Sequence, residues 1–377
     1  MDFELNEDQR AIAEMAGSLM SDYCTDERLR DWDLSGQAYM QDLWTGCVET
    51  GLHALAIPEA AGGSGLGMTE LMQILDAQGG ALAQVPLWRH QLAAATLAEF
   101  GDAPLAPWVE QAVAATGLLT LTLDGLTNVR GIELQARAEA DGWRLNGRVA
   151  ALPLAEQSMA ALVLAEVMGQ PRLVLVDLLQ AGISSVPGVM THGEAVADLS
   201  FENVALNKHQ VLPVAALDWL APRAIAALAS LQLGVSAEQV HRTVAYVSER
   251  QQFDRAIGSF QAVQMSMADT HVHLEVLRSA LWQLCYRLDA GLPAPSEALA
   301  TAYLACEAGH RIGHTAQHVH GGIGVDLTYP IHRFLYWSRA LSSALGGSSV
   351  ILERLGDWLN DNETLGWKYD LDEHQAL

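Results

Sequence analysis

The amino-acid sequence predicts an α+β protein with three domains: an N-terminal all-α domain, a middle antiparallel β domain and a C-terminal four-helix bundle. Its 377 residues exceed the size at which one hydrophobic core usually keeps growing, so two or three domains are expected. The N-terminal part is rich in Ala, Leu, Met and Glu, alternation of polar and apolar residues begins near residue 118, and helical spacing returns near residue 215. We place the domains at 1–113, 114–213 and 214–377.

The N-terminal domain is expected to be helical from residue 5 to about residue 105, with Asn6 as the cap of the first helix. Residues 57–67 interrupt this pattern with glycines at positions 62, 63, 65 and 67. Such a segment could hold a phosphate or could make a tight connection between two helices. Because no Lys or Ser/Thr stands at the spacing of a nucleotide-binding loop, we favour the connection.

The middle domain alternates polar and apolar residues, as the strands of a half-buried sheet do. Asp141–Gly142 and Asn146–Gly147 are dipeptides typical of two-residue hairpin turns, so they favour antiparallel pairing. The alternating segments are residues 118–123, 143–145, 173–176 and 197–206. We therefore expect one β domain between the two helical parts.

The C-terminal domain has long segments of helical spacing that are separated at residues 250–260, 291–295 and 321–324. Four helices of this length, joined by short connections, are expected to pack antiparallel as a bundle. The polar residues after Asn360 are expected to form an exposed end.

The composition excludes one class of partner and indicates a compartment. A formal net charge of −24 leaves no basic face for a phosphate backbone, so nucleic acid is excluded. The acidic N-terminus lacks an apolar signal core, no run approaches the length of a membrane span, and the protein is expected to be cytoplasmic. The cysteines form no Cys-x-x-Cys pair and are expected to be buried thiols in a reducing compartment; they are Cys24, Cys47, Cys285 and Cys306.

Residues 250–269 join two of the long helical segments and place an arginine, Arg250, near an aromatic residue, Phe253. At a helix-to-helix corner such residues can bind an anion and cover a flat ring, and the glutamines beside them can add hydrogen bonds. These residue types suit a dinucleotide cofactor. Alternatively, Arg250 is a helix-end cation paired with Glu249 or Asp254.

No metal site is expected. His318 and His320 are two residues apart, so on a helix they point to different faces, whereas a metal needs three or four converging ligands. Two pairs of large apolar side chains are interpreted as packing residues, in the core for Met265 and Met267 and in the core or an interface for Trp282 and Trp337.

Two motifs, together with this order of domains, resemble the acyl-CoA dehydrogenase family of flavoproteins. Residues 250–269 follow a pattern that members typically write as Arg-x-Gln-Phe-Gly, then Ile, then Phe-Gln and Ala-Asp, with Asp254 here in place of the glycine. The second motif is Ala-Gln-His-Val-His-Gly-Gly-Ile-Gly at 316–324, followed by Tyr-Pro-Ile-His-Arg at 329–333. The resemblance covers nearly the whole chain.

The resemblance implies FAD bound between the subunits of a dimer of dimers. It implies that a glutamate removes a proton from an acyl-CoA thioester while a hydride passes from the adjacent carbon to the flavin, giving the enoyl-CoA. Electron-transfer flavoprotein is the implied electron acceptor. Since the α-proton is only weakly acidic, hydrogen bonds to the thioester oxygen and a desolvated base close by are needed.

The residues that reach a neighbouring subunit's flavin in this family are largely matched here. Arg250 would pair with the pyrophosphate and Phe253 would pack on the cofactor, while the glutamines would donate hydrogen bonds and the glycines would let backbone approach closely. His318 stands where members usually have Gln, with Gln317 beside it, so that contact is altered. The predicted cofactor contacts are Arg250, Gln252, Phe253, Gln261, His318, Gly321 and Gly322.

The residues that would hold a flavin and a substrate in the chain's own site are missing. Residues 122–131 carry neither the family's Thr-Glu-Pro nor its Gly-Ser-Asp, and residues 150–154 lack its Trp-x-Thr. The usual position of the catalytic glutamate is Leu345, and an alternative position used by some members is Ala224. Neither side chain can abstract a proton, so no catalytic residue is assigned to this chain.

This combination resembles the non-catalytic subunit of paired bacterial acyl-CoA dehydrogenases, notably those acting on CoA thioesters of steroid side chains, which carry one flavin per unlike pair. It implies that the chain completes a flavin site whose glutamate and main cradle belong to a homologous partner subunit. Three alternatives stay open: a homomeric dehydrogenase with an unrecognised base, a flavin-free structural homologue, and a related flavoenzyme that activates oxygen or transfers a nitro group.

Overall fold

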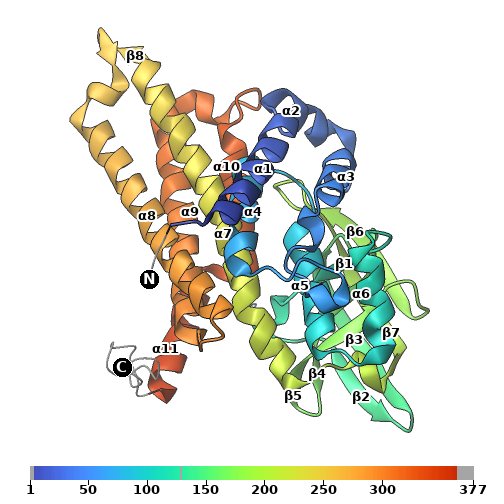
Figure 1. Cartoon of the computed structure of the whole chain (residues 1–377). Coiled ribbons are helices and arrows are strands. Elements are labelled where there is room, and N and C mark those ends of the chain that lie inside the picture. Colours follow the sequence, from blue (N-terminus) through green and yellow to red (C-terminus); the bar gives the residue numbers. More distant parts are fainter. Residues whose placement is uncertain (1–3, 128–129, 363–377) are drawn as a thin grey trace.

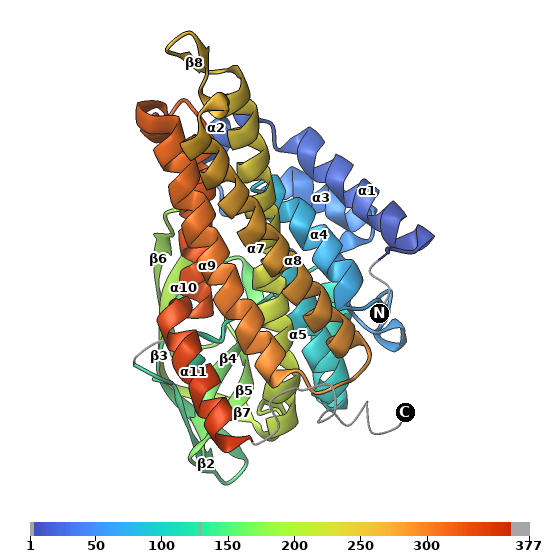
Figure 2. The same cartoon turned by 90° about the vertical axis from the view of Figure 1, so that its left-hand side faces the viewer.

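The computed structural model describes residues 4–127 and 130–362, and these form helical, β and helical parts in chain order, which confirms the predicted fold class (Figure 1). The N-terminal helices lie beside a long C-terminal bundle, and the sheet packs toward one end of both. Turning the molecule shows the long helices running side by side for most of its length (Figure 2).

The helices of the N-terminal domain begin with the predicted cap. The Asn6 Oδ1 accepts a hydrogen bond from the Gln9 amide, and the Gln9 side chain accepts one from the Asn6 amide. The helices are α1 (Glu7–Tyr23), α2 (Asp26–Ser35), α3 (Gln41–Glu49), α4 (Met68–Gly80), α5 (Leu87–Phe100) and α6 (Ala106–Val113).

The glycine-rich segment 57–67 is a connection between helices, as favoured above. The Gly63 amide donates to the Pro58 carbonyl oxygen (3.2 Å), and the Gly65 amide donates to the Ile57 carbonyl oxygen (2.8 Å). A Cβ at Gly63 would lie 2.2 Å from the Ile57 carbonyl oxygen, so only glycine fits there. Because these amides are already paired, they are not free to bind a phosphate.

The middle domain is a sheet with the strand order β1–β4–β2–β3–β7–β6, and β5 pairs with β4. The sheet is antiparallel, as predicted, at most of its pairings, but β4 pairs parallel with both β1 and β2. Alternation along one strand does not indicate the direction of a neighbour that is distant in the sequence. The strands are β1 (Leu118–Leu121), β2 (Gln135–Glu139), β3 (Gly142–Pro153), β4 (Ser158–Val167), β5 (Gln170–Asp177), β6 (Ile183–Val189) and β7 (Ala195–Asn207).

A hairpin forms at the first predicted turn, with its loop one residue earlier than Asp141–Gly142, and no turn forms at the second. The pairing of β2 with β3 leaves Ala140 and Asp141 as a two-residue loop. The prediction for Asn146–Gly147 is wrong, because this dipeptide lies inside β3 where its pairing with β7 shifts register. Gly147 has a φ of 128°, and a Cβ there would lie 2.1 Å from the Glu133 carbonyl oxygen. The glycine therefore serves a bulge and a close backbone approach rather than a turn.

The C-terminal domain is the predicted four-helix bundle with its fourth helix broken in two. The helices are α7 (Val214–Glu249), α8 (Gln261–Asp289), α9 (Pro295–His320), α10 (Ile331–Leu345) and α11 (Gly347–Asp361). The break falls at Gly346, whose φ of 95° is left-handed. The predicted exposed end is described only as far as Asn362, and the rest lies outside the described residues.

Helix α7 is the central helix, in contact with α4, α8, α9 and α10. It crosses α4 closely, since a Cβ at Gly234 would lie 1.9 Å from the Asp76 carbonyl oxygen. Contrary to the expectation that no run approaches a membrane span, α7 is long and apolar enough to qualify by length and composition. Half of the qualifying stretch is buried by neighbouring elements, as in the core helix of a globular protein.

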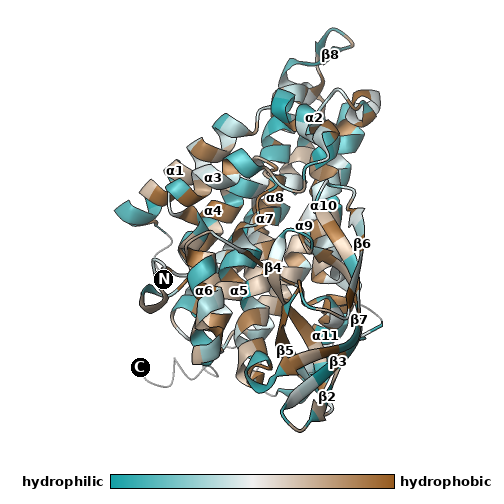
Figure 3. Ribbon diagram, turned by 90° about the vertical axis from the view of Figure 1, so that its right-hand side faces the viewer, coloured by the Kyte–Doolittle hydropathy of each residue, from teal (hydrophilic) through white to brown (hydrophobic). Residues whose placement is uncertain are grey.

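The hydrophobic core crosses the domain boundaries. Its larger cluster joins the N-terminal helices, the strands β1, β4 and β5 and the bundle, and a smaller cluster lies within the sheet. Colouring by hydropathy shows apolar residues where helices and sheet face each other (Figure 3). The four cysteines are buried and unpaired, as predicted.

Candidate functional site

Residues 250–260 form a hairpin that projects beyond the neighbouring helix ends (Figures 1 and 2). Phe253 and Asp254 are the two-residue loop, and the Ile257 amide closes the base by donating to the Arg250 carbonyl oxygen (2.8 Å). The strands are β8 (Gln251–Gln252) and β9 (Arg255–Ala256). We refer to residues 250–260 as the 250–260 hairpin.

The loop of this hairpin is conformationally strained. Phe253 has a φ of 54° and Asp254 a φ of 61°, so both central residues are left-handed, as in the turn type that favours Asn-Gly. Members of the resembled family have glycine at position 254. Left-handed non-glycine residues cost about 1 to 2 kcal/mol each, and such strain is retained mainly where function requires it.

The tip of the hairpin presents an aromatic ring to solvent. Phe253 is 87% exposed, and its ring meets Phe260 edge-on with the centroids 6.2 Å apart. The Arg255 guanidinium lies over the other aromatic ring, with Cζ 3.9 Å from the Phe260 centroid. Phe260 therefore supports the tip, while most of the Phe253 surface is left uncovered.

The polar residues predicted to contact a cofactor surround this tip. Arg250 is exposed, and among the described residues its guanidinium forms no ion pair with Glu249 or Asp254, so the helix-end ion pair is not seen. Gln252 Nε2 donates to the preceding carbonyl oxygen (2.8 Å), and Gln261 is the exposed first residue of α8. The hairpin thus offers a cation, an aromatic ring and two amides to an outside molecule.

The second predicted group lies at the C-terminal end of α9. His318, Gly321 and Gly322 are exposed, and a Cβ on either glycine would meet no atom within 4 Å. The Tyr246 ring, one turn before the hairpin, stacks on His320 with the centroids 4.3 Å apart. The two groups therefore lie at the same end of the bundle.

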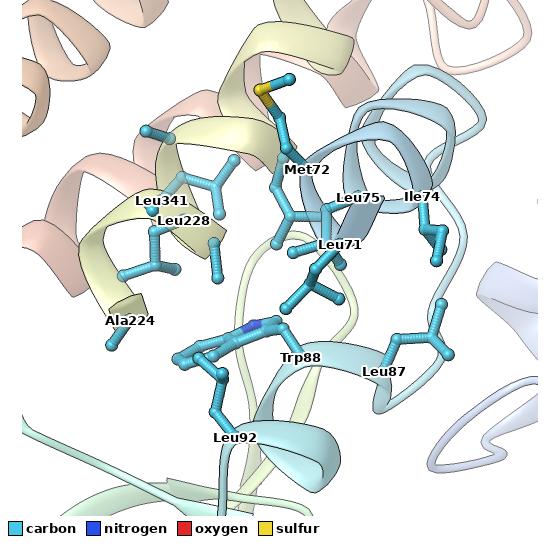
Figure 4. Packing of buried hydrophobic residues seen from close by; sticks show 14 of the residues in the cluster. Leu71, Met72, Ile74, Leu75, Leu87, Trp88, Leu92, Ala224, Leu228 and Leu341 are labelled. Carbon is cyan, nitrogen blue, oxygen red and sulfur yellow. The ribbon is translucent and has the colours of Figure 1, made fainter. Parts of the chain in front are cut away.

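A cavity of about 300 Å³ lies between the N-terminal helices, the sheet and the bundle. Leu345 and Ala224, the two family positions for a catalytic glutamate, both line it and are both buried. Trp88 of α5, Leu228 of α7 and Leu341 of α10 line it as well, and Figure 4 shows them around the same space. The wall is therefore apolar where a base would stand.

The segments at the positions of the missing flavin cradle form part of the cavity wall. A Cβ on Gly346 would lie 2.8 Å from the Thr127 Cβ, so the loop at residues 122–127 packs against the break between α10 and α11. Ala151, in the second segment, has a φ of 45°, and its amide donates to Asp198 Oδ1 (2.8 Å). Neither segment offers an aromatic ring. These residues do not fit a flavin in the chain's own site.

An ion pair that no sequence pattern indicated also faces the cavity. Arg89 of α5 donates to Glu194 Oε1 (2.5 Å), and His192 Nε2 lies 3.6 Å from Glu194 Oε2. Burial lowers the pKa of His192, so near pH 7 the cationic partner of Glu194 is Arg89.

The predicted packing residues have mixed outcomes. Trp337 is buried, with its ring edge-on to His192 at 5.3 Å, and Trp282 is half-buried against the core. Core packing is wrong for Met265, which is 61% exposed, because helical spacing identifies a face but not what covers it. Throughout the described ranges, no three His, Cys, Asp or Glu side chains come together as a metal site.

The chain matches two family models, described as acyl-CoA dehydrogenase, N-terminal domain, over residues 6–106, and acyl-CoA dehydrogenase, C-terminal domain, over residues 223–359. It is similar to acyl-CoA dehydrogenase FadE27 of Mycobacterium tuberculosis, with 32% identity over 379 residues, covering 94% of this chain and 98% of the relative.

Two solved structures are similar over almost the whole chain. One is the ChsE4-ChsE5 complex from Mycobacterium tuberculosis, with a TM-score of 0.91 and 32% identity, covering 96% of this chain and 100% of that chain. The other is a Tcur3481-Tcur3483 steroid ACAD variant, with a TM-score of 0.88 and 36% identity, covering 94% of this chain and 98% of that chain.

Proposed function

Because the chain belongs to the acyl-CoA dehydrogenase family, whose members are FAD-dependent oxidoreductases acting on CH–CH bonds, we propose that it is the non-catalytic subunit of a heteromeric acyl-CoA dehydrogenase. One observation carries the proposal. The chain keeps an exposed hairpin suited to a flavin, while both positions for a base in its own cavity are apolar.

The hairpin serves a site outside this chain. Arg250, Gln252 and Phe253 do not line the cavity that contains Leu345 and Ala224. They lie instead at the projecting end of the bundle (Figure 1). A strained turn with an uncovered aromatic tip is suited to contact another molecule.

In the proposed site FAD, when bound, supplies the hydride acceptor. Arg250 neutralises negative charge on the pyrophosphate, and its planar guanidinium can donate two parallel hydrogen bonds. Phe253 covers an apolar part of the cofactor and excludes water from it. Gln252 and Gln261 donate hydrogen bonds, and the exposed backbone at Gly321 approaches the cofactor closely. The remaining proposed contacts are His318 and Gly322.

The partner subunit supplies the acid–base chemistry. We assign to it the glutamate that removes the α-proton and the donors that stabilise charge on the thioester oxygen. Two similar structures are of named pairs, one of them a steroid ACAD, which supports an unlike, homologous partner and an acyl-CoA that carries a steroid side chain. Electron-transfer flavoprotein is the proposed electron acceptor.

Counting flavin per assembly tests the proposal. The chain is purified alone and after co-expression with a homologous dehydrogenase, and native mass and FAD absorbance are measured for each. We expect no stoichiometric FAD in the lone chain and one FAD per unlike pair. Arg250→Gln should weaken FAD binding by the pair about 10- to 100-fold, as expected for loss of hydrogen bonds to a charged group.

A matched arginine provides the control. Arg311 of α9 is exposed and paired with Glu307 (3.6 Å), so Arg311→Gln should leave FAD binding unchanged. Stoichiometric FAD with dehydrogenase activity in the lone chain would overturn the proposal in favour of a homomeric enzyme. Glu194, the carboxylate beside the cavity, would then be the base to substitute first.

A further inference from the structure

A second, larger cavity adjoins the apolar one. The second cavity has a volume of about 840 Å³ and lies between the start of α7, the α8–α9 connection and α11. The residues that line both cavities lie where the two adjoin: Leu126, Ala221, Ile225, Leu299 and Arg354. Together they make an inner and an outer chamber of a size typical of small-molecule sites.

Arg354 of α11 lines both cavities and has no partner among the residues that the structure describes. Within the described residues its guanidinium has no hydrogen bond, ion pair or ring contact, although Asp218 and Asp357 line the same outer cavity. Arg354 is half-buried, and burial lowers its pKa, so the charge is partly shielded from water. A desolvated cation with unused donors favours an anion from outside the chain.

The other arginine of the outer cavity is already satisfied. Arg223 Nη1 donates to the Trp219 carbonyl oxygen (2.9 Å), its Nη2 donates to the Leu288 carbonyl oxygen (3.4 Å), and its Cζ lies 3.9 Å from the Trp219 ring centroid. Arg354 is therefore the cation of this cavity that has donors left for a ligand.

The two chambers differ in character on either side of Arg354. The inner one is walled by aliphatic side chains such as Leu228, Leu341 and Leu345, which suit an apolar body. The outer one is lined by the aromatic rings of Trp219 and Trp358. A ligand with an apolar body and one anionic group would bury the body in the inner chamber and leave the anion beside Arg354.

We propose that the chain binds an apolar carboxylic acid in this two-chamber cavity, with the hydrocarbon body in the inner chamber and the carboxylate on Arg354. Neither Leu345 nor Ala224 offers a base, so the acid is held without reaction. This inference is independent of the proposed flavin contact, because Arg354 and the 250–260 hairpin are on different elements and Arg250 does not line either chamber.

Calorimetric titration of the full chain, alone and in its assembly, tests this site with decanoate, decan-1-ol and 5β-cholanate. We expect saturable decanoate or cholanate binding, and Arg354→Gln should weaken it about tenfold or more while leaving decanol unchanged. Arg354→Lys should keep most of the affinity because it keeps the charge. Ala224→Phe, which fills the inner chamber, should remove decanoate and decanol binding together.

The controls separate this site from folding and from the partner's site. Arg311→Gln should bind like the wild type, and circular dichroism should show Arg354→Gln folded with unchanged FAD content in the assembly. A preference for cholanate over decanoate would assign a steroid acid, and the reverse a linear one. Equal carboxylate affinity in wild type and Arg354→Gln, or no saturable binding of either acid, would overturn the proposal.

Discussion

Leu345 and Ala224 show how a single side chain decides whether a cavity can do chemistry. Both line the cavity and both are buried, which are the surroundings that raise the pKa of a carboxyl and make it a base. The chain has apolar side chains at both positions, so the same burial only adds packing. The cavity is kept here, while neither position carries a carboxylate.

Restoring the carboxylate alone should not restore activity. Leu345→Glu places a charge at a position only 3% exposed, so we expect a loss of about 3 kcal/mol in the free energy of unfolding near pH 8, and a smaller loss at pH 5 where the acid is protonated. The lone variant should remain without FAD and inactive, because the cradle is still missing. Leu345→Met is the packing control, with an expected cost under about 1.5 kcal/mol. An active, flavin-bound lone variant would contradict this account.

Asp76 of α4 is a buried carboxyl whose ionisation should lower the stability of the fold. Its Oδ1 is shut off from solvent without a hydrogen-bond partner, and burial raises the pKa of this carboxyl to about 6, against an opposing effect of Arg278. The folded state therefore holds the proton more tightly than the unfolded state, and the penalty of ionisation grows as the pH rises from about 4 to about 6.

Asp76→Asn should remove this penalty. We expect the variant to be more stable than the wild type by about 2 kcal/mol at pH 8, with the advantage shrinking as the pH falls below 6. Chemical denaturation at pH 8 and pH 4.5 measures both values. An equal difference at the two pH values would show that the effect is not ionisation.

At the scale of elements, the tip of the 250–260 hairpin depends on a turn in which Phe253 and Asp254 both adopt an unfavourable left-handed conformation. Asp tolerates the left-handed region better than most side chains, whereas a β-branched residue does not. Because the hairpin projects from the bundle, its opening need not unfold the helices.

Asp254→Val should therefore weaken FAD binding by the assembly about tenfold, which corresponds to about 1.4 kcal/mol, without lowering the thermal midpoint of the subunit. Asp254→Gly, which suits the turn and matches the family pattern, should bind FAD at least as well as the wild type. Fluorescence titration of FAD and a thermal melt separate the two effects. A lowered midpoint with unchanged FAD affinity would show that the turn serves the fold instead.

The sequence predicted those elements whose signals are local. Helical spacing located the long helices and the corner at Arg250, and Asn6 was correctly placed as a cap. Asn146–Gly147 was misassigned because a bulge and a turn use the same dipeptide, and only the pairing of β3 with β7 distinguishes them. The exposure of Met265 depends on what covers α8, which spacing cannot state.

The candidate site was predictable only in part, for the same reason. Leu345 and Ala224 were found by counting within family motifs, and the structure brings both to one cavity. The Arg89–Glu194 pair had no signal in the sequence, because its contact joins segments far apart in the chain. Arg354, which has no partner among the described residues, had none because the sequence does not show which elements surround it.

At the scale of the whole molecule, two histidines bind the end of α6, and one of them, His90, also joins α5 to the sheet. His90 of α5 accepts a hydrogen bond from the Leu119 amide at Nδ1 (3.2 Å), so its Nε2 carries the proton and donates to the Ala112 carbonyl oxygen (3.1 Å). His53 Nε2 lies 2.9 Å from the carbonyl oxygen of Val113, the last residue of α6. These bonds satisfy the end of α6 and fix the start of β1.

The stability of the whole chain should therefore depend on the neutral form of His90. Burial lowers the pKa of His90 to about 4, so its contribution is fully present above about pH 6.5 and is lost as the pH falls toward 4. His90→Gln should lower stability at pH 7.5 by about 2 kcal/mol and flatten the loss between pH 6.5 and pH 4.5. Denaturant unfolding across this range measures the slope. The exposed His241→Gln is the control, and an unchanged slope in His90→Gln would contradict the assignment.

The position of the 250–260 hairpin outside its own cavity has a thermodynamic consequence. If one subunit's arginine and aromatic ring complete the flavin site of the other, then cofactor and subunit each tighten the other's binding by the same factor. Diluting the assembly should release FAD, and added FAD should lower the concentration at which the subunits separate. The flavin absorbance then measures how much of the protein is assembled, because the tip of one hairpin couples FAD binding to subunit association.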